Sequence, residues 1–256
     1  YEFFQISKKY DGDQNPLIKP IIGIEAYVAP STRKSRVQEF WGTSRDAGDP
    51  DAEGGKDVSG GGRYTHMTMW AKDSEGLHNL FRLSSLASYE GYYMKPRMDR
   101  ELMGQYSGGI IASTGCPSGE VQTRLRLGQF EEACQAASDY RDIFGRENYF
   151  CELMDHGVPI EKQVRSDLLK LAKKLDIPLL VTNDSHYVTE DQADAHDSLL
   201  CVGVGRNKDD PNRFRFNGSG YYIKSSEQMR ALFPDHPEAC DNTLLLTEMI
   251  GSYDEV

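Results

Sequence analysis

Apolar and polar positions alternate along most of the chain in two recurring patterns. Short apolar runs bounded by turn residues are typical of buried strands, and apolar residues three and four apart are typical of amphipathic helices. We predict strands at 21–28, 64–71, 110–113, 148–154 and 177–181, and helices at 74–89, 130–144 and 161–176. Strands and helices that follow one another in this way to about Val204 predict a parallel α/β sheet or barrel.

Three segments depart from this alternation. The first residues, Tyr1 to Ile6, have helical spacing without an N-cap, so we expect the chain to begin inside a helix that starts upstream. Residues 30–63 are rich in Gly and Asp and predict a long, exposed, mobile loop without a catalytic role. From Gly205 a basic, Gly-rich loop leads to two short helices, so we interpret residues 1–204 as one domain and residues 205–256 as an α-rich junction.

Composition limits the classes of protein to consider. Of the 256 residues, 38% are hydrophobic, enough for a sizeable core, and no apolar run reaches membrane-spanning length. The 40 acidic and 29 basic side chains leave a net charge of −11, which disfavours general binding of nucleic acid phosphates. Five cysteines without a CxxC pair indicate neither a disulfide framework nor a zinc finger, and they favour a reducing cytoplasm.

The stretch IPLLVTNDSHYV ends an apolar run with Asp184 and His186. A polar turn after a buried strand is the ordinary explanation. In an extended chain, however, side chains two apart point to the same side, and a carboxylate beside an imidazole suits a metal or general acid–base chemistry. Glu25, His66 and Cys116 lie at comparable places at or beyond the other predicted strands, where α/β folds collect functional residues.

Taken singly, each of these groups has an ordinary structural explanation. A strand Glu is usually at the surface, a His among apolar residues is usually a satisfied core residue, and a Cys is usually small and buried. Two carboxylates, two imidazoles and a thiol at the ends of four strands are harder to explain by chance, and this mix of donors suits zinc, manganese or iron. Glu152, Asp155 and His156 rank lower, as partners that support the ligands.

Two roles remain open for Cys116. Within TGCPSG it could be a nucleophile at a helix N-terminus, where the thiolate is stabilised, or a metal ligand. The His and Asp residues at the other strand ends favour the ligand.

Six stretches of the chain resemble the PHP (polymerase and histidinol phosphatase) domain of bacterial replicative DNA polymerase III α subunits, of the actinobacterial type. They are IIGIEAYVAP, THMTMWA, GIIASTGCPSGEVQTRLRLGQ, NYFCELMDHG, LLVTNDSHYV and DPNRFRFNGSGYYIKS. Their order and spacing cover nearly the whole chain, and the Gly-rich loop before His66 is the most divergent part.

This resemblance implies a distorted (βα)7-type PHP barrel, incomplete at its N-terminus, with a cluster of up to three divalent metal ions in its mouth. On matching positions the ligands would be Glu25, His66, Cys116, Asp184 and His186, and the last two would also be catalytic. The family's His-x-His pair and its Thr-Asp-His-Gly motif have no counterpart here and would lie upstream of Tyr1. We therefore expect an intact cluster in the parent protein and no activity from the 256-residue chain alone.

The function that the resemblance implies is a metal-dependent 3′–5′ proofreading exonuclease within a DNA-directed DNA polymerase. Its partners would be DNA, the remaining domains of the α subunit and replisome components such as the sliding clamp, without a membrane. The alternatives are a non-catalytic PHP module that braces the polymerase and a free-standing PHP phosphoesterase. Cys116 together with both histidines favours the exonuclease, and the tail from Gly205 argues against the phosphoesterase.

The tail also carries four basic residues on an otherwise acidic chain: Arg206, Lys208, Arg213 and Arg215. We predict that they form a local basic patch facing DNA or a neighbouring domain. A solvated charged loop explains them about equally well.

Overall fold

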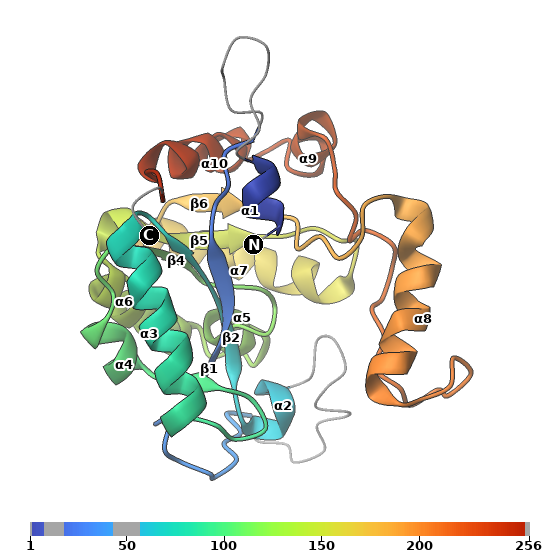
Figure 1. Cartoon of the computed structure of the whole chain (residues 1–256), viewed down its shortest axis with the longest axis horizontal. Helices are drawn as coiled ribbons and strands as arrows, with labels where there is room; N and C mark the ends of the chain where they lie inside the picture. Colours follow the sequence, from blue (N-terminus) through green and yellow to red (C-terminus); the bar gives the residue numbers. More distant parts are fainter. Residues whose placement is uncertain (1, 8–17, 43–56, 254–256) are drawn as a thin grey trace.

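The computed structural model describes residues 2–7, 18–42 and 57–253, in which one six-stranded sheet is flanked by helices (Figure 1). The strands are β1 (Gly23–Val28), β2 (Thr65–Ala71), β3 (Arg97–Met98), β4 (Ile110–Ser113), β5 (Tyr149–Leu153) and β6 (Leu179–Val181). Their order in the sheet is β3-β1-β2-β4-β5-β6. The five predicted strands are confirmed to within two residues at each end, and the short β3 is an addition.

The orientation of β2 corrects the expectation of a parallel sheet. β2 runs antiparallel to both β1 and β4, whereas the other neighbouring pairs are parallel. A parallel pair needs a long crossover, usually a helix. Between β1 and β2 the described residues form only the short α2 (Ser59–Gly62), and the chain re-enters the sheet where it left, with Val28 opposite Thr65. The sheet is mixed, and within the described residues β3 and β6 are its edges, so closure into a barrel stays a prediction.

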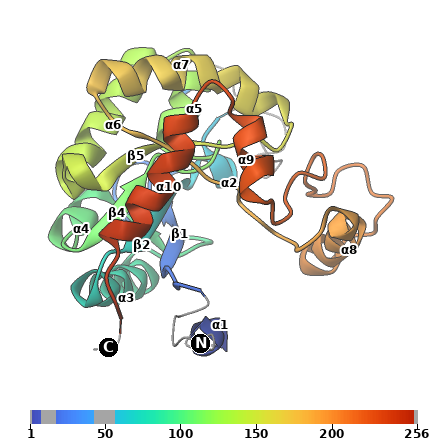
Figure 2. The same cartoon turned by 90° about the horizontal axis from the view of Figure 1, so that it is seen from above.

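The helices surround this sheet unevenly. Figure 2 shows α3, α4, α6 and α7 in an arc around one side, while α8 stands apart from the body in both views. The predicted helices at 74–89, 130–144 and 161–176 are confirmed as α3, α6 and α7. The bounds are α1 (Glu2–Ser7), α3 (Ser74–Glu90), α4 (Arg100–Gln105), α5 (Glu120–Arg126), α6 (Phe130–Phe144), α7 (Pro159–Leu175), α8 (Ala193–Val204), α9 (Ser226–Leu232) and α10 (Pro237–Met249), with 3-10 turns at Arg146–Asn148 and Glu190–Gln192.

The core lies where the central strands meet these helices. Met69 of β2 and Ile111 of β4 are fully buried, and they belong to one cluster with Leu83 of α3, Ala137 of α6 and Leu171 of α7. Burial of such side chains away from water is the main stabilising contribution to folding. It fixes the strands whose ends carry the candidate site.

Most of the described side chains between residues 31 and 40 are exposed, as expected, whereas residues 57–62 are largely buried, and two buried charges anchor this segment to the fold. Arg33 is buried and pairs with Asp99 at 2.9 Å and with Glu90 at 2.8 Å. Asp57 is also buried and accepts hydrogen bonds from the backbone N–H groups of Trp41 and Gly42. Buried charges require such partners. Residues 43–56 lie outside the described residues.

The two helices expected after Gly205 are present as α9 and α10; α10 packs on the sheet, and α9 packs on α10. α10 lies against β6, where the Asn242 side chain donates to the Leu179 carbonyl at 2.7 Å. Beyond it, the buried Tyr253 hydroxyl donates to the carbonyl of Ala71 at 2.5 Å. The tail therefore shares the core of the sheet, and its role as a junction to another domain stays a prediction. Among the described residues, the helices are too short or too polar for a membrane span.

Candidate metal centre

A cleft of about 460 Å³ opens at the edge of the sheet where β1 ends and β2 begins. All five predicted ligands line it: Glu25, His66, Cys116, Asp184 and His186. The antiparallel course of β2 explains the position of His66, which is the second residue of its strand rather than the last. The start of β2 lies at the edge where the parallel strands β4, β5 and β6 end. Whether these five residues bind metal stays a prediction.

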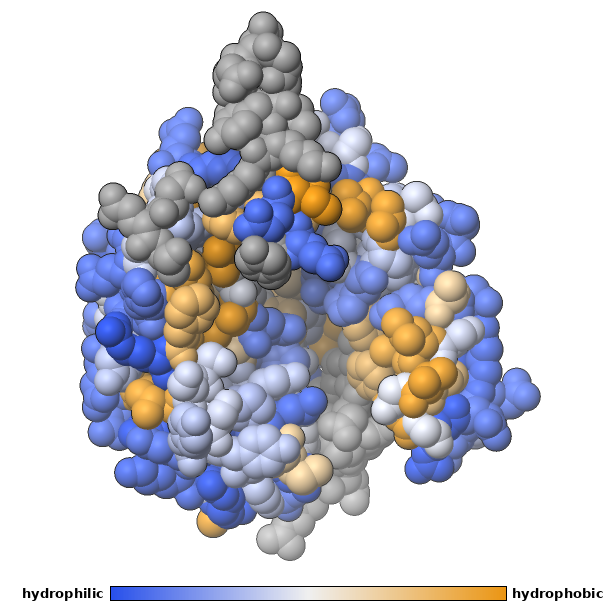
Figure 3. Space-filling model, viewed as in Figure 1, coloured by the Kyte–Doolittle hydropathy of each residue, from blue (hydrophilic) through white to orange (hydrophobic). Residues whose placement is uncertain are grey.

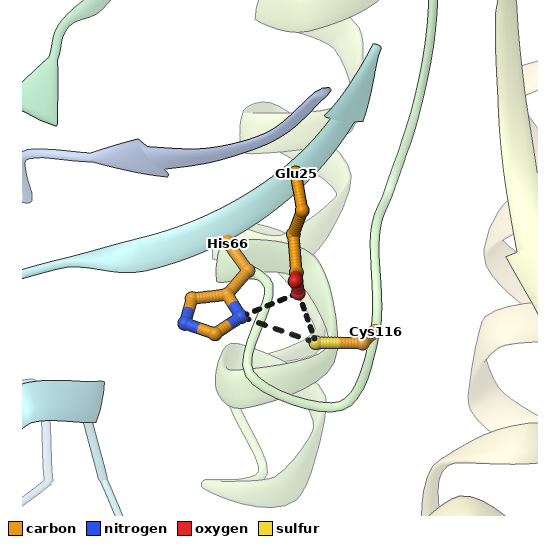
Figure 4. A group of neighbouring side chains, drawn as sticks. All are labelled: Glu25, His66 and Cys116. Atoms are coloured by element: carbon orange, nitrogen blue, oxygen red, sulfur yellow. Dashed lines mark hydrogen bonds and ion pairs between the residues drawn. The ribbon is translucent and has the colours of Figure 1, made fainter. Parts of the chain in front are cut away.

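Three of the five come within ligand distance of one another (Figure 4). Glu25 Oε1 lies 2.7 Å from His66 Nδ1, and Cys116 Sγ lies 3.6 Å from that oxygen and 3.5 Å from that nitrogen. Tetrahedral zinc, with bonds of about 2.0 Å to N or O and about 2.3 Å to S, holds sulfur about 3.5 Å from its other ligands. Both sulfur distances fit this value, whereas the Glu25–His66 hydrogen bond would lengthen by about half an ångström.

The backbone sets this arrangement. Cys116 lies in the turn after β4, and that turn is tied to the start of β2 because the His66 N–H donates to the Ser118 carbonyl at 3.1 Å. The His66 ring also contacts Tyr27 and Tyr64, with centroid distances of 5.2 and 5.8 Å. His66 is thus held on one side by aromatic rings and on the other by the carboxylate and the thiol.

Within the triad, the proton on the Cys116 thiol opposes metal binding. Burial, reinforced by the negative Glu25, raises the pKa of the Cys116 thiol well above its usual value. The hydrogen bond from His66 lowers the pKa of Glu25, and this effect outweighs burial. The carboxylate is therefore ionised while the thiol keeps its proton. Since a metal binds the thiolate, binding has to release that proton.

Asp184 and His186 reach the cleft from a loop. This corrects the expectation that an extended strand directs their side chains to the same side. β6 ends at Val181, and Asp184 has a φ of 39°, in the left-handed region that Asp and Asn tolerate best among residues with a Cβ. His186 Nδ1 lies 2.9 Å from the backbone carbonyl of Asp184. A proton on Nδ1 leaves the Nε2 lone pair available to a cation. Burial raises the pKa of Asp184.

His156, one of the supporting partners expected from sequence, holds this loop. Its Nε2 donates to the Asn183 carbonyl at 2.7 Å, its Nδ1 donates to Glu161 at 2.5 Å, and its ring stacks on Tyr221 at 4.2 Å. Burial lowers the pKa of His156, but Glu161 and the carbonyl of Asn183 outweigh it, so the pKa is raised. Because both ring nitrogens face acceptors, His156 is an imidazolium that fixes the residue before Asp184.

The other two expected supporting partners lie outside the lining of the cleft. Glu152 is buried and accepts hydrogen bonds from Thr182 at 2.5 Å, from Thr68 at 3.1 Å and from Ser113. Burial raises the pKa of Glu152 despite these three hydroxyl donors. Asp155 instead pairs with Arg165 at 2.7 Å. Their support of a metal stays a prediction.

Three of the four basic residues of the tail form ion pairs, two of them with α8. Arg213 is buried and forms two bonds to Asp197 of α8, at 2.6 and 2.7 Å. Lys208 pairs with Asp194 and Arg206 pairs with Asp210. Arg213 is thus an internal cation rather than part of an exposed patch. Contact of the tail with DNA or another domain stays a prediction.

The cleft also has walls that the sequence reasoning did not single out. Tyr27, Tyr64 and Lys95 line one part of it, and Phe214 and Phe216 line another. Alternation along β1 could have indicated Tyr27, which lies two residues after Glu25 and so on the same face. Nothing local placed Phe214 and Phe216 there, because their position depends on α8. Figure 3 shows apolar side chains gathered on the surface over α8. The exposed apolar residues of this helix include Leu199 and Val202.

Comparisons with known proteins agree with the sequence resemblance. A family model described as PHP domain matches residues 1–156. The DNA polymerase III subunit alpha of Saccharopolyspora erythraea is 58% identical over the whole chain, and that of Mycobacterium tuberculosis is 52% identical over 99% of it. The corresponding subunit of Thermus aquaticus is 37% identical over 91%. The chain spans about a fifth of the length of these relatives, 21%, 21% and 18% respectively.

Proposed function

The chain belongs to the PHP domain family and is similar along its whole length to DNA polymerase III alpha subunits, and from this premise we propose that it is the PHP domain of a replicative DNA polymerase. In the intact parent it acts as a metal-dependent 3′–5′ exonuclease that proofreads. The parent is a DNA-directed DNA polymerase of the cytoplasm, and its partners are DNA, its own further domains and the sliding clamp.

The observation that carries the proposal is the convergence of Glu25, His66 and Cys116 within 4.8 Å, in the cleft that Asp184 and His186 also line. Carboxylate, imidazole and thiol donors of this mix fit zinc, manganese or iron. Divalent ions bound by these residues would supply an activated water and charge stabilisation for phosphodiester hydrolysis. A complete PHP barrel with its cluster of up to three ions, residues 1–204 as that domain and residues 205–256 as the link to the polymerase core are parts of the same proposal.

The chain's own residues have distinct roles in this reaction. Glu25 and Asp184 place negative charge on two sides of the cleft and so attract cations. His186 directs its Nδ1 proton to the Asp184 carbonyl, which leaves the Nε2 lone pair to coordinate a cation. His156 keeps the intervening loop in place through Asn183. The sheet positions Glu25, and the loop after β6 positions Asp184 and His186, so the groups keep the fixed geometry that metal-assisted hydrolysis requires.

The decisive experiment replaces Asp184 in the full-length parent polymerase. Asp184→Asn keeps the size of the side chain and its tolerance of a left-handed backbone, but it removes the charge. We expect 3′–5′ exonuclease activity to fall at least about a hundredfold while polymerisation persists. Bound metal per protein, measured by mass spectrometry, should fall as well.

Asp142→Asn is the matched control, since Asp142 lies on the exposed side of α6 and should leave both activities unchanged. Full proofreading by the Asp184→Asn polymerase would refute the exonuclease role. If metal content also fell in that case, the domain would instead be a structural module that binds metal for stability.

A further inference from the structure

The cleft has aromatic side chains on two sides of the proposed ligands. Tyr27 and Tyr64 lie at the strand side, with ring centroids 4.8 Å apart, and both brace His66. Phe214 and Phe216 lie at the side of α8, with ring centroids 5.6 Å apart. The two tyrosines position a proposed ligand, whereas phenylalanine side chains cannot bind a metal, so Phe214 and Phe216 at the mouth need a separate explanation.

The two phenylalanines differ in their contacts. The Phe216 ring contacts His186 at 4.6 Å, Tyr221 at 4.7 Å and His196 at 5.1 Å, so Phe216 packs the loop that carries His186. Within the described residues, Phe214 has a ring contact to Phe216 alone, and it stays partly exposed to the cleft. Among the aromatic rings of the described residues, Phe214 therefore has fewer partners than Phe216.

The backbone at Phe214 is nevertheless held firmly. The preceding residue, Arg213, binds Asp197 of α8 through two bonds and also donates to the carbonyl of Lys208 at 3.0 Å. A partly exposed aromatic ring on an anchored backbone is preorganised to receive a flat ligand, because little side-chain freedom is lost on binding.

The charged groups along the cleft indicate which kind of ligand it can bind. Lys95 is exposed, lies 5.3 Å from the Tyr27 ring, and is the only lysine or arginine along the cleft within the described residues. Metal ions at Glu25, Asp184 and their neighbours would add further positive charge. A ligand with an anionic group and a planar apolar group matches these walls, and a nucleotide has both.

We propose that Phe214 is the stacking platform for the terminal nucleobase of the DNA strand, with its phosphate directed to the metal ligands and Lys95. This inference rests on the proposed exonuclease function and specifies its substrate. A base in a duplex is already stacked and paired, so only an unpaired 3′ terminus can place its base on the ring. Phe214 thereby makes the site selective for frayed or mismatched ends over paired ones.

The test uses the full-length parent polymerase and two readouts. In the first, a single-stranded oligonucleotide carries 5-iodouracil at its 3′ terminus and a phosphorothioate terminal linkage, which slows cleavage, and the crosslinked peptide is identified by mass spectrometry. We expect the crosslink at Phe214 and its loss in Phe214→Leu, which keeps apolar bulk without an aromatic face. In the second, Phe214→Leu should raise KM for single-stranded DNA about tenfold with kcat nearly unchanged.

Two further variants separate stacking from general damage. Phe214→Trp should restore KM, and Phe81→Leu, an exposed phenylalanine on α3, should change neither readout. The preference for a mismatched over a paired 3′ end should shrink in Phe214→Leu alone. If Phe214→Leu kept a normal KM and an unchanged crosslink while the exonuclease still depended on Asp184, the stacking role of Phe214 would be refuted and the proposed function would stand. A crosslink at Phe214 in a polymerase whose exonuclease ignores Asp184 would support the nucleotide site and refute the proposed catalysis.

Discussion

The His156–Glu161 pair offers a measurable prediction about stability. Both side chains are almost fully buried, at 2% and 4% exposure, and they join the loop after β5 to the first turn of α7. His156→Leu keeps similar bulk but removes both donors. Glu161 then keeps only the backbone N–H of residue 156, and the Asn183 carbonyl loses its donor. Breaking a buried pair in this way typically costs about 3–5 kcal/mol, a large part of a domain's stability.

Urea unfolding of the 256-residue chain measures this cost from the extrapolated free energy of unfolding. Arg146→Leu is the matched control, because it breaks an ion pair with Asp176 whose side chains are 64% and 80% exposed and should cost less than about 1 kcal/mol. The double variant His156→Leu, Glu161→Leu should recover part of the loss, since it leaves no buried charge unpaired.

The pH dependence has a defined sign. The pKa of His156 is raised in the folded state, so its stabilising effect is complete below its unfolded pKa of about 6.5 and is lost as pH rises through the higher folded pKa. The difference between wild type and His156→Leu should therefore shrink from pH 6 towards pH 9. A difference that grows over this range, or a loss no larger than that of Arg146→Leu, would refute the reasoning.

Two other predictions concern the metal site. Because the pKa of the Cys116 thiol is raised and the thiol must lose its proton, metal affinity should rise by up to about tenfold per pH unit near neutrality. Calorimetry in buffers of different ionisation enthalpy measures the proton release, which Cys116→Ala should abolish. A metal affinity that does not change with pH would contradict this prediction. Gly60→Ala places a Cβ 2.2 Å from the Tyr64 ring at a φ of 59°, so it should lower the free energy of unfolding by at least about 1–2 kcal/mol and loosen His66. Gly104→Ala is the control, because there is open space around its Cβ. Equal melting temperatures for the two variants would be inconsistent with this prediction.

Local pattern was enough to predict most of the elements. Strand Ile110–Ser113 and helix Phe130–Phe144 follow directly from a short apolar run and a helical period, both of which are properties of neighbouring residues. The orientation of β2 was not predictable in this way, because it depends on where segment 29–64 returns to the sheet. The burial of Arg33 depends on Asp99, 66 residues away, and a polar, Gly-rich segment gives no sign of such a partner.

For the candidate site as well, local pattern indicated some residues, whereas the positions of others depend on distant parts of the chain. Residue type and position near predicted strands indicated Glu25 and Cys116, which lie 91 residues apart and meet at 3.6 Å. Asp184 and His186 line the cleft, but a left-handed turn brings them there instead of the extended strand that the sequence suggested. Phe214 could not be inferred, because its position is set by the pairing of Arg213 with α8.

The contact of Asp57 with Trp41 and Gly42 has a consequence for variation in length. Its carboxylate accepts both backbone N–H groups at 2.9 and 2.7 Å, so the two ends of segment 43–56 are fastened together whatever path lies between them. The entropy of closing a loop changes only by about 0.6 kcal/mol for each doubling of its length. Residues can therefore be gained or lost between Gly42 and Asp57 without shifting the register of β1 against β2.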